Sequence, residues 1–291
     1  MPELPEVETV RRGLSRLVIG KTVARETHDW AKGFLAAEAD VANFLINAII
    51  TDVRRRAKVL MIDLSTEYTL VVHLKMTGQL VFVGADAERF GAGHPNDSLI
   101  GQLPDRSTRV SLHFTDGSTL FFNDQRKFGW MRLMPTLEVP NIDFMQKVGP
   151  EPLADDFTPE QFTQRLRRRA NTSIKAALLD QTVVAGIGNI YADESLWGAR
   201  IHPVTLVKNT SDSSLTLLFN EMRAVLLLSI EKGGSTDRNY VNAEGKRGSY
   251  IDFARVFRRE GQPCPRCGTT IEKSRVAGRG THVCPHCQKQ Q

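Results

Sequence analysis

The sequence DQTVVAGIGNIYADE, residues 180–194, interrupts a region of helical periodicity and decides how the second half of the chain folds. Gly186 and Gly188 break the pattern, because glycine costs about 1 kcal/mol in a helix interior. The segment is therefore typical of a turn between two helices. Alternatively, its backbone amides and Asn189, at the start of the second helix, could hold a phosphate. On either interpretation, a helical domain surrounds this turn.

Helical periodicity continues on both sides of the turn. Thr158 and Pro159 are a capping residue and a first-turn proline, which together mark a helix N-terminus. Residues 215–230 repeat apolar side chains at the spacing of a long amphipathic helix. Proline and glycine interrupt residues 136–152, which we interpret as a hinge. We therefore predict a helical domain over residues 153–234.

Downstream, the four cysteines of the chain form two Cys-x2-Cys pairs that are separated by 16 residues. These cysteines are Cys264, Cys267, Cys284 and Cys287. Two such pairs are typical of a tetrahedral zinc site, and four cysteine ligands leave no open position for catalysis. We predict one structural Zn²⁺ in a module over residues 251–291, with disulfides or free thiols as the alternative. A polar loop, residues 235–250, precedes the module.

The first half of the chain changes its period. Residues 1–20 repeat apolar side chains at helical spacing, and short apolar or alternating runs then follow, punctuated by turn residues such as Asp116-Gly117. These runs are residues 59–64, 69–74, 80–83, 109–114 and 119–122. We predict a two-sheet antiparallel β domain that carries the first helix, over residues 1–135. Residues 84–108, rich in Gly, Pro and Asp, are predicted to be a long surface loop.

The charge is unevenly distributed along the 291 residues. Residues 1–150 contain 18 Lys and Arg against 18 Asp and Glu, whereas residues 151–291 contain 20 against 15. The formal charge of +5 therefore lies in the second half, which favours a polyanionic partner. The longest apolar run, residues 224–230, is too short to cross a bilayer, and no secretory leader begins the chain. We expect a cytoplasmic protein with no membrane partner.

The N-terminus combines two features that could support chemistry. Removal of Met1 would leave Pro2 with a free secondary amine, and part of an α-amino group is neutral at cellular pH because its pKa is about 8. Such an amine can attack an aldehyde-like carbon and form an iminium, which promotes elimination. Glu3 is the adjacent candidate acid or base, and Glu6 lies on the same helical face. The alternative is that these prolines and acids only cap a helix.

Basic and apolar side chains elsewhere also allow two interpretations. The runs at residues 54–58 and 165–169 could be solvated or could bind phosphates. Met76 is most simply explained as a methionine of the hydrophobic core. Arg126 and Phe128 could mark the end of a strand. In a nucleic-acid enzyme, these same three side chains could instead fill a base stack after one nucleotide has been extruded.

Three segments together resemble bacterial formamidopyrimidine-DNA glycosylases. MPELPEVETVRRGL, residues 1–14, is similar to their N-terminus, and residues 180–194 are similar to their helix–two-turn–helix signature. VAGRGTH, residues 276–282, resembles their zinc finger before its second knuckle. The resemblance runs in order from residue 1 to Cys287, and Leu4 favours this branch over the endonuclease VIII-like branch.

The resemblance implies an α+β multidomain fold. An N-terminal two-sheet antiparallel β-sandwich with an N-terminal helix is followed by a helix–two-turn–helix domain with a four-cysteine zinc-finger hairpin. The implied activity is that of a bifunctional base-excision-repair DNA glycosylase and AP lyase for oxidised purines, such as 8-oxoguanine and formamidopyrimidines. Its partner is double-stranded DNA, its cofactor is one structural Zn²⁺, and we expect a monomer that acts at the nucleoid. A non-catalytic damaged-DNA-binding homologue is the alternative.

Residue by residue, the resemblance also implies a catalytic set. Pro2 resembles the nucleophile that attacks C1′ of deoxyribose, and Glu3 the acid that assists ring opening, with Glu6 in support. Lys58 resembles the lysine that contacts the lesion phosphate and assists β-elimination. Arg279 resembles the finger arginine that contacts phosphate and is assigned to δ-elimination.

DNA contacts are implied at further positions. Met76, Arg126 and Phe128 match the trio that fills the void left by the flipped nucleotide. The other residues assigned to DNA binding are His73, Arg109, Arg169, Lys175 and Asn189. Many family members carry His-x-His where this chain has Ser107-Thr108-Arg109, and we expect Arg109 to take over that contact. Residues 235–250 resemble the loop that closes over the flipped purine.

Overall fold

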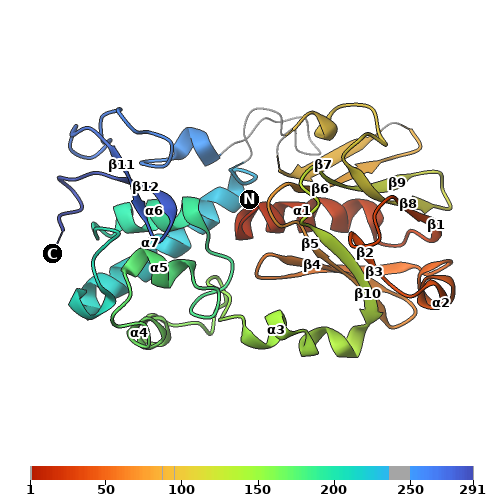
Figure 1. Ribbon diagram of the computed structural model, residues 1–291, viewed down its shortest axis with the longest axis horizontal. Helices are drawn as coiled ribbons and strands as arrows, with labels where there is room; N and C mark the ends of the chain where they lie inside the picture. The colour runs from red at the N-terminus through yellow and green to blue at the C-terminus, as the bar shows by residue number, and fades with distance from the viewer. Residues whose placement is uncertain (1, 87, 95, 236–249, 291) are drawn as a thin grey trace. The chain divides into compact units, whose positions relative to one another are not determined.

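The computed structural model describes residues 2–86, 88–94, 96–235 and 250–290, which form two compact units (Figure 1). Unit 1 contains the described residues up to 146 together with 232–235. Unit 2 contains residues 147–231 and 250–290. Each unit has a hydrophobic core of its own, so we describe each by itself.

Unit 1 is a sandwich of two five-stranded sheets. The first sheet has the order β1 (Val23–His28), β8 (Thr108–Phe114), β9 (Thr119–Asp124), β6 (Gly78–Val83) and β7 (Arg89–Gly93). The second has the order β2 (Phe34–Leu35), β10 (Trp130–Pro135), β5 (Tyr68–His73), β4 (Val59–Leu64) and β3 (Ile50–Arg56). Neighbouring strands pair antiparallel except β2 and β10, which pair in parallel over two residues. The predicted sandwich is therefore confirmed, with this one parallel pairing as a correction.

Helix α1 (Leu4–Val18) lies between the two sheets (Figure 1) and packs against β7 and β3, their edge strands on one side. Pro5 stands in its first turn, where a missing amide donor is tolerated. Its apolar face, including Val7, Val10 and Leu14, is fully buried. The helix therefore covers two strand edges that would otherwise present unpaired backbone groups.

Short helical turns connect the strands of unit 1. They are α2 (Glu38–Asp40), a π-turn η1 (Val41–Leu45), the 3-10 turns η2 (Asp97–Leu99) and η3 (Thr136–Asn141), and α3 (Asp143–Lys147). The prediction of a surface loop over residues 84–108 is wrong in part, because this region contains β7, η2 and the start of β8. Phe90 of β7 is buried against α1, but glycines beside it obscure the strand pattern in the sequence.

Unit 2 is helical, with one hairpin. Its elements are α4 (Pro159–Arg167), α5 (Ile174–Leu179), α6 (Asn189–Gly198), η4 (Val207–Asn209), α7 (Asp212–Glu231), η5 (Tyr250–Phe253), β11 (Glu272–Val276) and β12 (Arg279–Val283). Thr158 caps α4, since its hydroxyl accepts a hydrogen bond from Gln161 N at 3.3 Å. Of the helices described, only α7 is long and apolar enough to cross a membrane, and its buried face belongs to the core of the unit.

Candidate functional site

The N-terminal residues form a buried, hydrogen-bonded start to α1. Pro2 is buried, and the side chains of Glu3 and Glu6 are almost fully enclosed. Glu6 Oε2 accepts the Glu3 amide at 2.8 Å, while Glu6 Oε1 accepts the Ser235 amide at 2.7 Å. Glu6 therefore caps the helix and also anchors the chain just before residue 236. Capping and chemistry are not exclusive here, because the bond to Glu6 fixes the backbone of Glu3, the residue that follows Pro2.

Lys58 is presented by a tight hairpin. Arg56 pairs with Val59, so Ala57 and Lys58 form the whole β3–β4 turn, and Ala57 takes a positive φ of 52°. The Lys58 side chain is buried. Both the hairpin geometry and the burial restrict where its amine can lie.

His73 lies beside this hairpin, because it pairs with Val59 across β4 and β5. Burial lowers the pKa of His73 to about 3, and the charges of Lys75 and Lys58 add to that effect. Its Nδ1 accepts the Lys75 amide at 3.0 Å, so the neutral ring carries its proton on Nε2. His73 can therefore offer a neutral N–H donor to a partner, but it has no positive charge near pH 7.

The three predicted wedge residues lie together at one end of the sandwich. Met76 is on the β5–β6 turn, while Arg126 and Phe128 are on the β9–β10 turn. The Arg126 guanidinium lies 4.8 Å from the centroid of the Phe128 ring, and its Nη1 lies 3.3 Å from Met76 Sδ. Met76 is 37% exposed and Phe128 is 51% exposed. The two turns therefore present an exposed apolar surface beside the Arg126 guanidinium.

A fully buried carboxylate, Asp124, joins these two turns. Its Oδ1 accepts the Thr77 hydroxyl and the Arg126 amide, and its Oδ2 accepts the amides of Phe128 at 2.8 Å and Gly129 at 2.6 Å. A side chain at Gly129 would meet the Phe122 ring at 2.8 Å, so the turn requires glycine there. Asp124 thus sets the positions of all three wedge residues.

Arg109 does not project from the surface, contrary to the prediction. It is 5% exposed, and its guanidinium donates to the carbonyl of Asp124 at 2.9 Å, to the Arg106 carbonyl and to the Asp29 carboxylate. The buried guanidinium supports the backbone of Asp124 at the end of β9. Arg109 therefore has a structural role within unit 1.

In unit 2, the segment 180–188 forms two turns between α5 and α6. The Gln181 side chain ties them together by donating to the carbonyls of Leu179 and Ile187 and accepting the Gly186 amide at 3.0 Å. Gly186 has a positive φ of 80°, as a tight turn requires. Asn189 begins α6, and its Nδ2 donates to Gly280 O at 3.0 Å.

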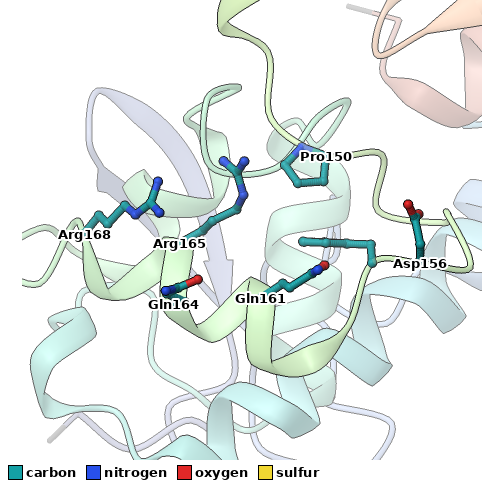
Figure 2. Close-up of a pocket in the computed structure, with 7 residues that line it drawn as sticks. Pro150, Asp156, Gln161, Gln164, Arg165 and Arg168 are labelled. Carbon is teal, nitrogen blue, oxygen red and sulfur yellow. The ribbon is translucent and has the colours of Figure 1, made fainter.

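The basic run at residues 165–169 is largely engaged within unit 2. Arg167 bonds to two carbonyls and to Asp212, Arg169 pairs with Asp180, and Arg165 bonds to the Thr182 carbonyl. Arg165 and Arg168 also line a cavity of about 330 Å³ along α4 (Figure 2). The other lining residues are Pro150, Asp156, Phe157, Gln161 and Gln164. Arg169 remains half exposed, so a phosphate could still reach it.

Lys175 is buried, which contradicts its assignment as a direct DNA contact. Its side chain is 0% exposed, and its ammonium group pairs with Asp193 Oδ1 at 2.6 Å. Asp193 lies on α6 and is equally buried. The sequence does not show whether this lysine is buried. Its burial depends on the ion pair with Asp193, which is 18 residues away and contacts Lys175 only in the folded chain.

The four cysteines converge on one point. Their sulfur atoms lie within 4.8 Å of one another, with Cys264 and Cys287 at 4.0 Å and Cys267 and Cys284 at 3.5 Å. A tetrahedral zinc with bonds of about 2.3 Å separates its sulfurs by about 3.8 Å, so the set fits one Zn²⁺. Trp197 Nε1 donates to Cys264 Sγ at 3.4 Å and supports the ligand from α6.

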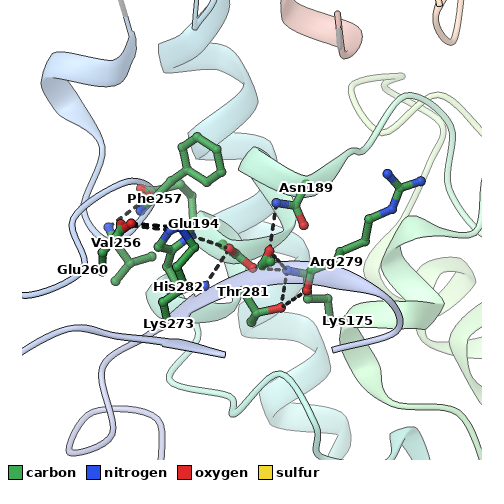
Figure 3. A network of polar contacts seen from close by, with 12 residues as sticks. Lys175, Asn189, Glu194, Val256, Phe257, Glu260, Lys273, Arg279, Thr281 and His282 are labelled. Atoms are coloured by element: carbon green, nitrogen blue, oxygen red, sulfur yellow. Dashed lines mark hydrogen bonds and ion pairs between the residues drawn. The ribbon is translucent and has the colours of Figure 1, made fainter. Parts of the chain in front are cut away.

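Arg279 follows the turn of the finger hairpin. Val276 pairs with Arg279, so Ala277 and Gly278 form a two-residue turn, and both have a positive φ. The Arg279 side chain is exposed and points away from the buried contacts beneath it (Figure 3).

Three protein families match successive parts of the chain. Residues 1–131 match the formamidopyrimidine-DNA glycosylase N-terminal domain, and residues 148–240 match the H2TH domain of the same enzymes. Residues 261–290 match the zinc finger found in FPG and IleRS.

The chain belongs to the formamidopyrimidine-DNA glycosylase family.

Relatives of known sequence and structure agree with this. The formamidopyrimidine-DNA glycosylases of Herpetosiphon aurantiacus and Pediococcus pentosaceus are each 43% identical to the chain, which aligns over 99% of its length with 100% and 99% of theirs. The Lactococcus lactis Fpg, solved in complex with DNA that contains an abasic site, is 35% identical and superposes with a TM-score of 0.86. The superposition covers 99% of this chain and 100% of that one. The predicted family, fold and structural zinc site are confirmed.

Some residues of this family member that the sequence did not single out organise its candidate site. Asp124 holds the wedge turns, Asp193 pairs with Lys175, and Glu194 accepts the amides of Arg255, Val256 and Phe257 at 2.9 Å each. Asp124 is the last residue of β9, where turn formation is the usual explanation, and Asp193 and Glu194 lie within α6, where a solvated acid is the usual explanation. Their burial is the only signal of a larger role, and burial of an acid is not visible in one sequence.

Proposed function

We propose that this chain is a bifunctional DNA glycosylase and AP lyase, which removes oxidised purines from double-stranded DNA and then cuts the strand by β,δ-elimination. Full-length likeness to formamidopyrimidine-DNA glycosylases carries the proposal. Relatives solved with lesion-containing DNA support the choice of DNA as partner. The buried start of the chain supports Pro2 and Glu3 as the reacting pair.

The first step replaces one bond to C1′ by another. The Pro2 nitrogen, free after removal of Met1, donates its lone pair to C1′, and the glycosidic electron pair leaves with the purine, which takes up a proton. Glu3 protonates O4′ as the C1′–O4′ bond opens, which leaves an iminium between Pro2 and the sugar. The hydrogen bond from the Glu3 amide to Glu6 keeps Glu3 at this position.

The iminium then drives strand cleavage. It acidifies the C2′ proton, and loss of that proton sends an electron pair into the C2′–C3′ bond while the C3′–O bond breaks and the 3′ phosphate leaves. We assign binding of this phosphate and assistance of the β-elimination to Lys58. A second proton loss expels the 5′ phosphate, the δ-elimination that we assign to Arg279. Water hydrolyses the iminium and regenerates Pro2.

Extrusion of the damaged nucleotide precedes this chemistry. Unstacking one base costs a few kcal/mol, and side chains that refill the stack offset part of that cost. Met76, Arg126 and Phe128 already form one exposed cluster, which supports this role. The guanidinium of Arg126 can donate hydrogen bonds to the unpaired base on the opposite strand.

Other parts of the proposal concern phosphate binding, the zinc ion, the cellular location and the oligomeric state. Phosphates would be bound by Arg169, by the N-terminal turn of α6 at Asn189 and by the finger, with His73 as a neutral donor. Zinc would shape the finger without taking part in the reaction. Residues 235–250, proposed to cap the lesion, lie outside the described residues except for Ser235 and Tyr250. We propose a cytoplasmic monomer that acts at the nucleoid.

Borohydride trapping tests the proposal. Reduction of the iminium should link the wild-type enzyme covalently to duplex DNA that contains 8-oxoguanine opposite cytosine. Pro2→Gly should retain DNA binding, yet lose most of the trapped product. Intact-mass measurement of the same sample checks that Met1 has been removed. A processed wild-type enzyme that binds lesion DNA and gives no trapped product would instead be the non-catalytic damaged-DNA-binding homologue.

A further inference from the structure

Three successive residues of the finger strand, Gly280, Thr281 and His282, are hydrogen-bonded to the helical core. Gly280 O accepts Asn189 Nδ2 at 3.0 Å and Lys175 Nζ at 3.1 Å. The next hydroxyl, Thr281 Oγ1, accepts Lys175 Nζ at 2.7 Å. His282 N donates to Asp193 Oδ2 at 2.9 Å. The helices thereby fix three successive residues of β12 (Figure 3).

One chain of contacts reaches Arg279 itself. Asp193 Oδ1 accepts Lys175 Nζ at 2.6 Å, Lys175 donates to Thr281 Oγ1, and Thr281 Oγ1 donates to Arg279 O at 3.1 Å. We call these three side chains, Asp193, Lys175 and Thr281, the fingertip relay. All three are fully buried, whereas the Arg279 side chain is exposed. The relay therefore grips the backbone that carries an exposed arginine.

A buried ion pair is an unusual way to hold a strand. Removing two charges from water opposes folding, so an apolar contact would stabilise the hairpin equally well. Charged and hydrogen-bonded groups differ from apolar ones in that they fix direction: Lys175 must point at two oxygens of β12, and Asp193 must accept from a third residue. This arrangement specifies register and orientation more than stability.

We propose that the fingertip relay positions Arg279 for δ-elimination, so that Asp193, Lys175 and Thr281 are positioning residues of the lyase reaction. The proposal rests on the proposed function, because it uses the role assigned there to Arg279. An arginine beside a two-residue turn has freedom in both backbone and side chain, and a displacement of about 1 Å in a reacting group can slow a step about 100-fold. The relay removes the backbone part of that freedom.

The test separates the two eliminations on duplex DNA with a preformed abasic site, where base removal plays no part. Asp193→Asn and Thr281→Val should slow δ-elimination about 10- to 100-fold, while β-elimination and borohydride trapping stay within about twofold of wild type. Thr281→Val is the milder change, since it removes one hydroxyl and leaves the ion pair intact. Zinc content and the thermal midpoint are measured on each variant.

A second arm asks whether the relay acts through Arg279. Arg279→Ala alone should slow δ-elimination, and adding Asp193→Asn to it should slow the step no further, because the positioned group is already absent. Asp212→Asn is the matched control: it also removes an aspartate paired with a cation in unit 2, but that carboxylate is exposed and lies on α7. It should leave both eliminations unchanged.

Three results would overturn the proposal. They are unchanged δ-elimination in zinc-loaded Asp193→Asn and Thr281→Val, additive losses in the Arg279→Ala background, and loss of zinc by Thr281→Val, which would make the relay a folding element. If Arg279→Ala itself leaves δ-elimination unchanged, both the relay and the role of Arg279 fail. The glycosylase and lyase assignment is then still judged separately, by trapping with Pro2→Gly.

Discussion

Residues in strained backbone conformations mark the turns that carry the candidate site. Eight non-glycine residues of the described chain have a positive φ, and four of them lie within two residues of a predicted site residue. These four are Ala57 before Lys58, Lys75 before Met76, Lys127 between Arg126 and Phe128, and Ala277 before Arg279. Each such conformation costs about 1–3 kcal/mol and persists only where the surroundings enforce it. The side chains beside them are therefore held in defined positions.

Asp124→Asn should disturb the wedge without unfolding the sandwich. Both carboxylate oxygens of Asp124 accept backbone amides. An asparagine has only one oxygen, so its NH₂ group would face amide donors and leave them without an acceptor. Leaving buried donors unsatisfied costs about 1–3 kcal/mol. We expect a loss of stability of that size in urea unfolding and about tenfold slower base excision from duplex DNA in single-turnover assays.

Asp116→Asn provides the comparison for this variant. Asp116 also accepts a turn amide, that of Ser118 at 3.0 Å, but it lies on the β8–β9 hairpin with its carboxylate half exposed. We expect wild-type excision from this variant. Equal excision rates for Asp124→Asn and wild type would show that the wedge does not depend on the buried carboxylate.

His73 should make the protein less stable in mild acid. Its pKa is near 6.5 in the unfolded chain and about 3 in the folded protein, so between these values the unfolded state binds more protons. Stability is therefore complete above about pH 6.5 and is lost progressively as the pH falls toward 3. His73→Gln, which is neutral throughout, should flatten the decrease in thermal midpoint between about pH 7.5 and about pH 5.

His28→Gln is the control for that measurement, since His28 lies exposed on β1. Its thermal midpoint should follow the wild-type pH dependence. A His73→Gln variant with an unaltered pH dependence would mean that the buried ring is protonated in the folded protein, contrary to the assignment of a neutral donor.

At the scale of elements, α1 and β7 pack together with very little space between them. Gly13 faces the Phe90 ring so closely that an added Cβ would lie 1.9 Å from Phe90 Cζ. Gly13→Ala should therefore destabilise unit 1 by about 1–3 kcal/mol, although alanine is the better helix former by about 1 kcal/mol. Chemical unfolding measures the difference.

A double-mutant cycle identifies the cause of that loss. Phe90→Leu shortens the side chain that fills the space, so Gly13→Ala combined with Phe90→Leu should be more stable than the sum of the two single effects predicts. Strict additivity would mean that the alanine acts on something other than the Phe90 contact.

Helix α6 shows how two adjacent acids connect the helical part of unit 2 with its zinc module. Asp193 binds β12, while Glu194 accepts three consecutive amides at residues 255–257 and the Tyr250 hydroxyl at 3.0 Å. Burial and the neighbouring Glu194 charge raise the pKa of Tyr250, so its hydroxyl stays a donor. Neither acid can be replaced by a neighbour, because each points to a different segment.

At the scale of the whole molecule, zinc removal should report on the finger and on DNA binding separately. Trp197 donates to Cys264 Sγ and lies under the Arg266 guanidinium, 3.9 Å from its ring centroid. Chelation should therefore change tryptophan fluorescence and weaken binding to abasic-site DNA together, and added Zn²⁺ should restore both. Metal binding and folding of such modules are coupled, so the loss should be large.

Trp197→Phe tests the origin of the signal. This variant should lose most of the fluorescence change and still lose DNA binding on chelation, since the other tryptophans lie at residues 30 and 130 in unit 1. Full DNA binding by the zinc-free protein would contradict the role proposed for the finger.

The sequence alone determined what depends on local spacing or on residue type. The two Cys-x2-Cys pairs specify four zinc ligands, the glycines at 186 and 188 specify the turn before α6, and the N-terminal prolines specify the start of α1. Each of these features is recognised from neighbours within a few residues. Pro2 and Glu3 are singled out on the same local grounds, with helix capping as the alternative, whereas the role of Lys58 comes from the resemblance to a known family.

Only the tertiary structure decided which charged residues are buried and what they bind. Arg109 and Lys175 are residue types that often contact phosphates, yet the fold encloses both. Asp29 supplies the carboxylate partner of Arg109, and Asp193 that of Lys175. Phe90 of β7 likewise packs against Gly13 on α1, a contact between segments far apart in the sequence. A charge can enter the interior only when a distant segment provides its counter-charge and hydrogen bonds, and that pairing exists only once the chain has folded.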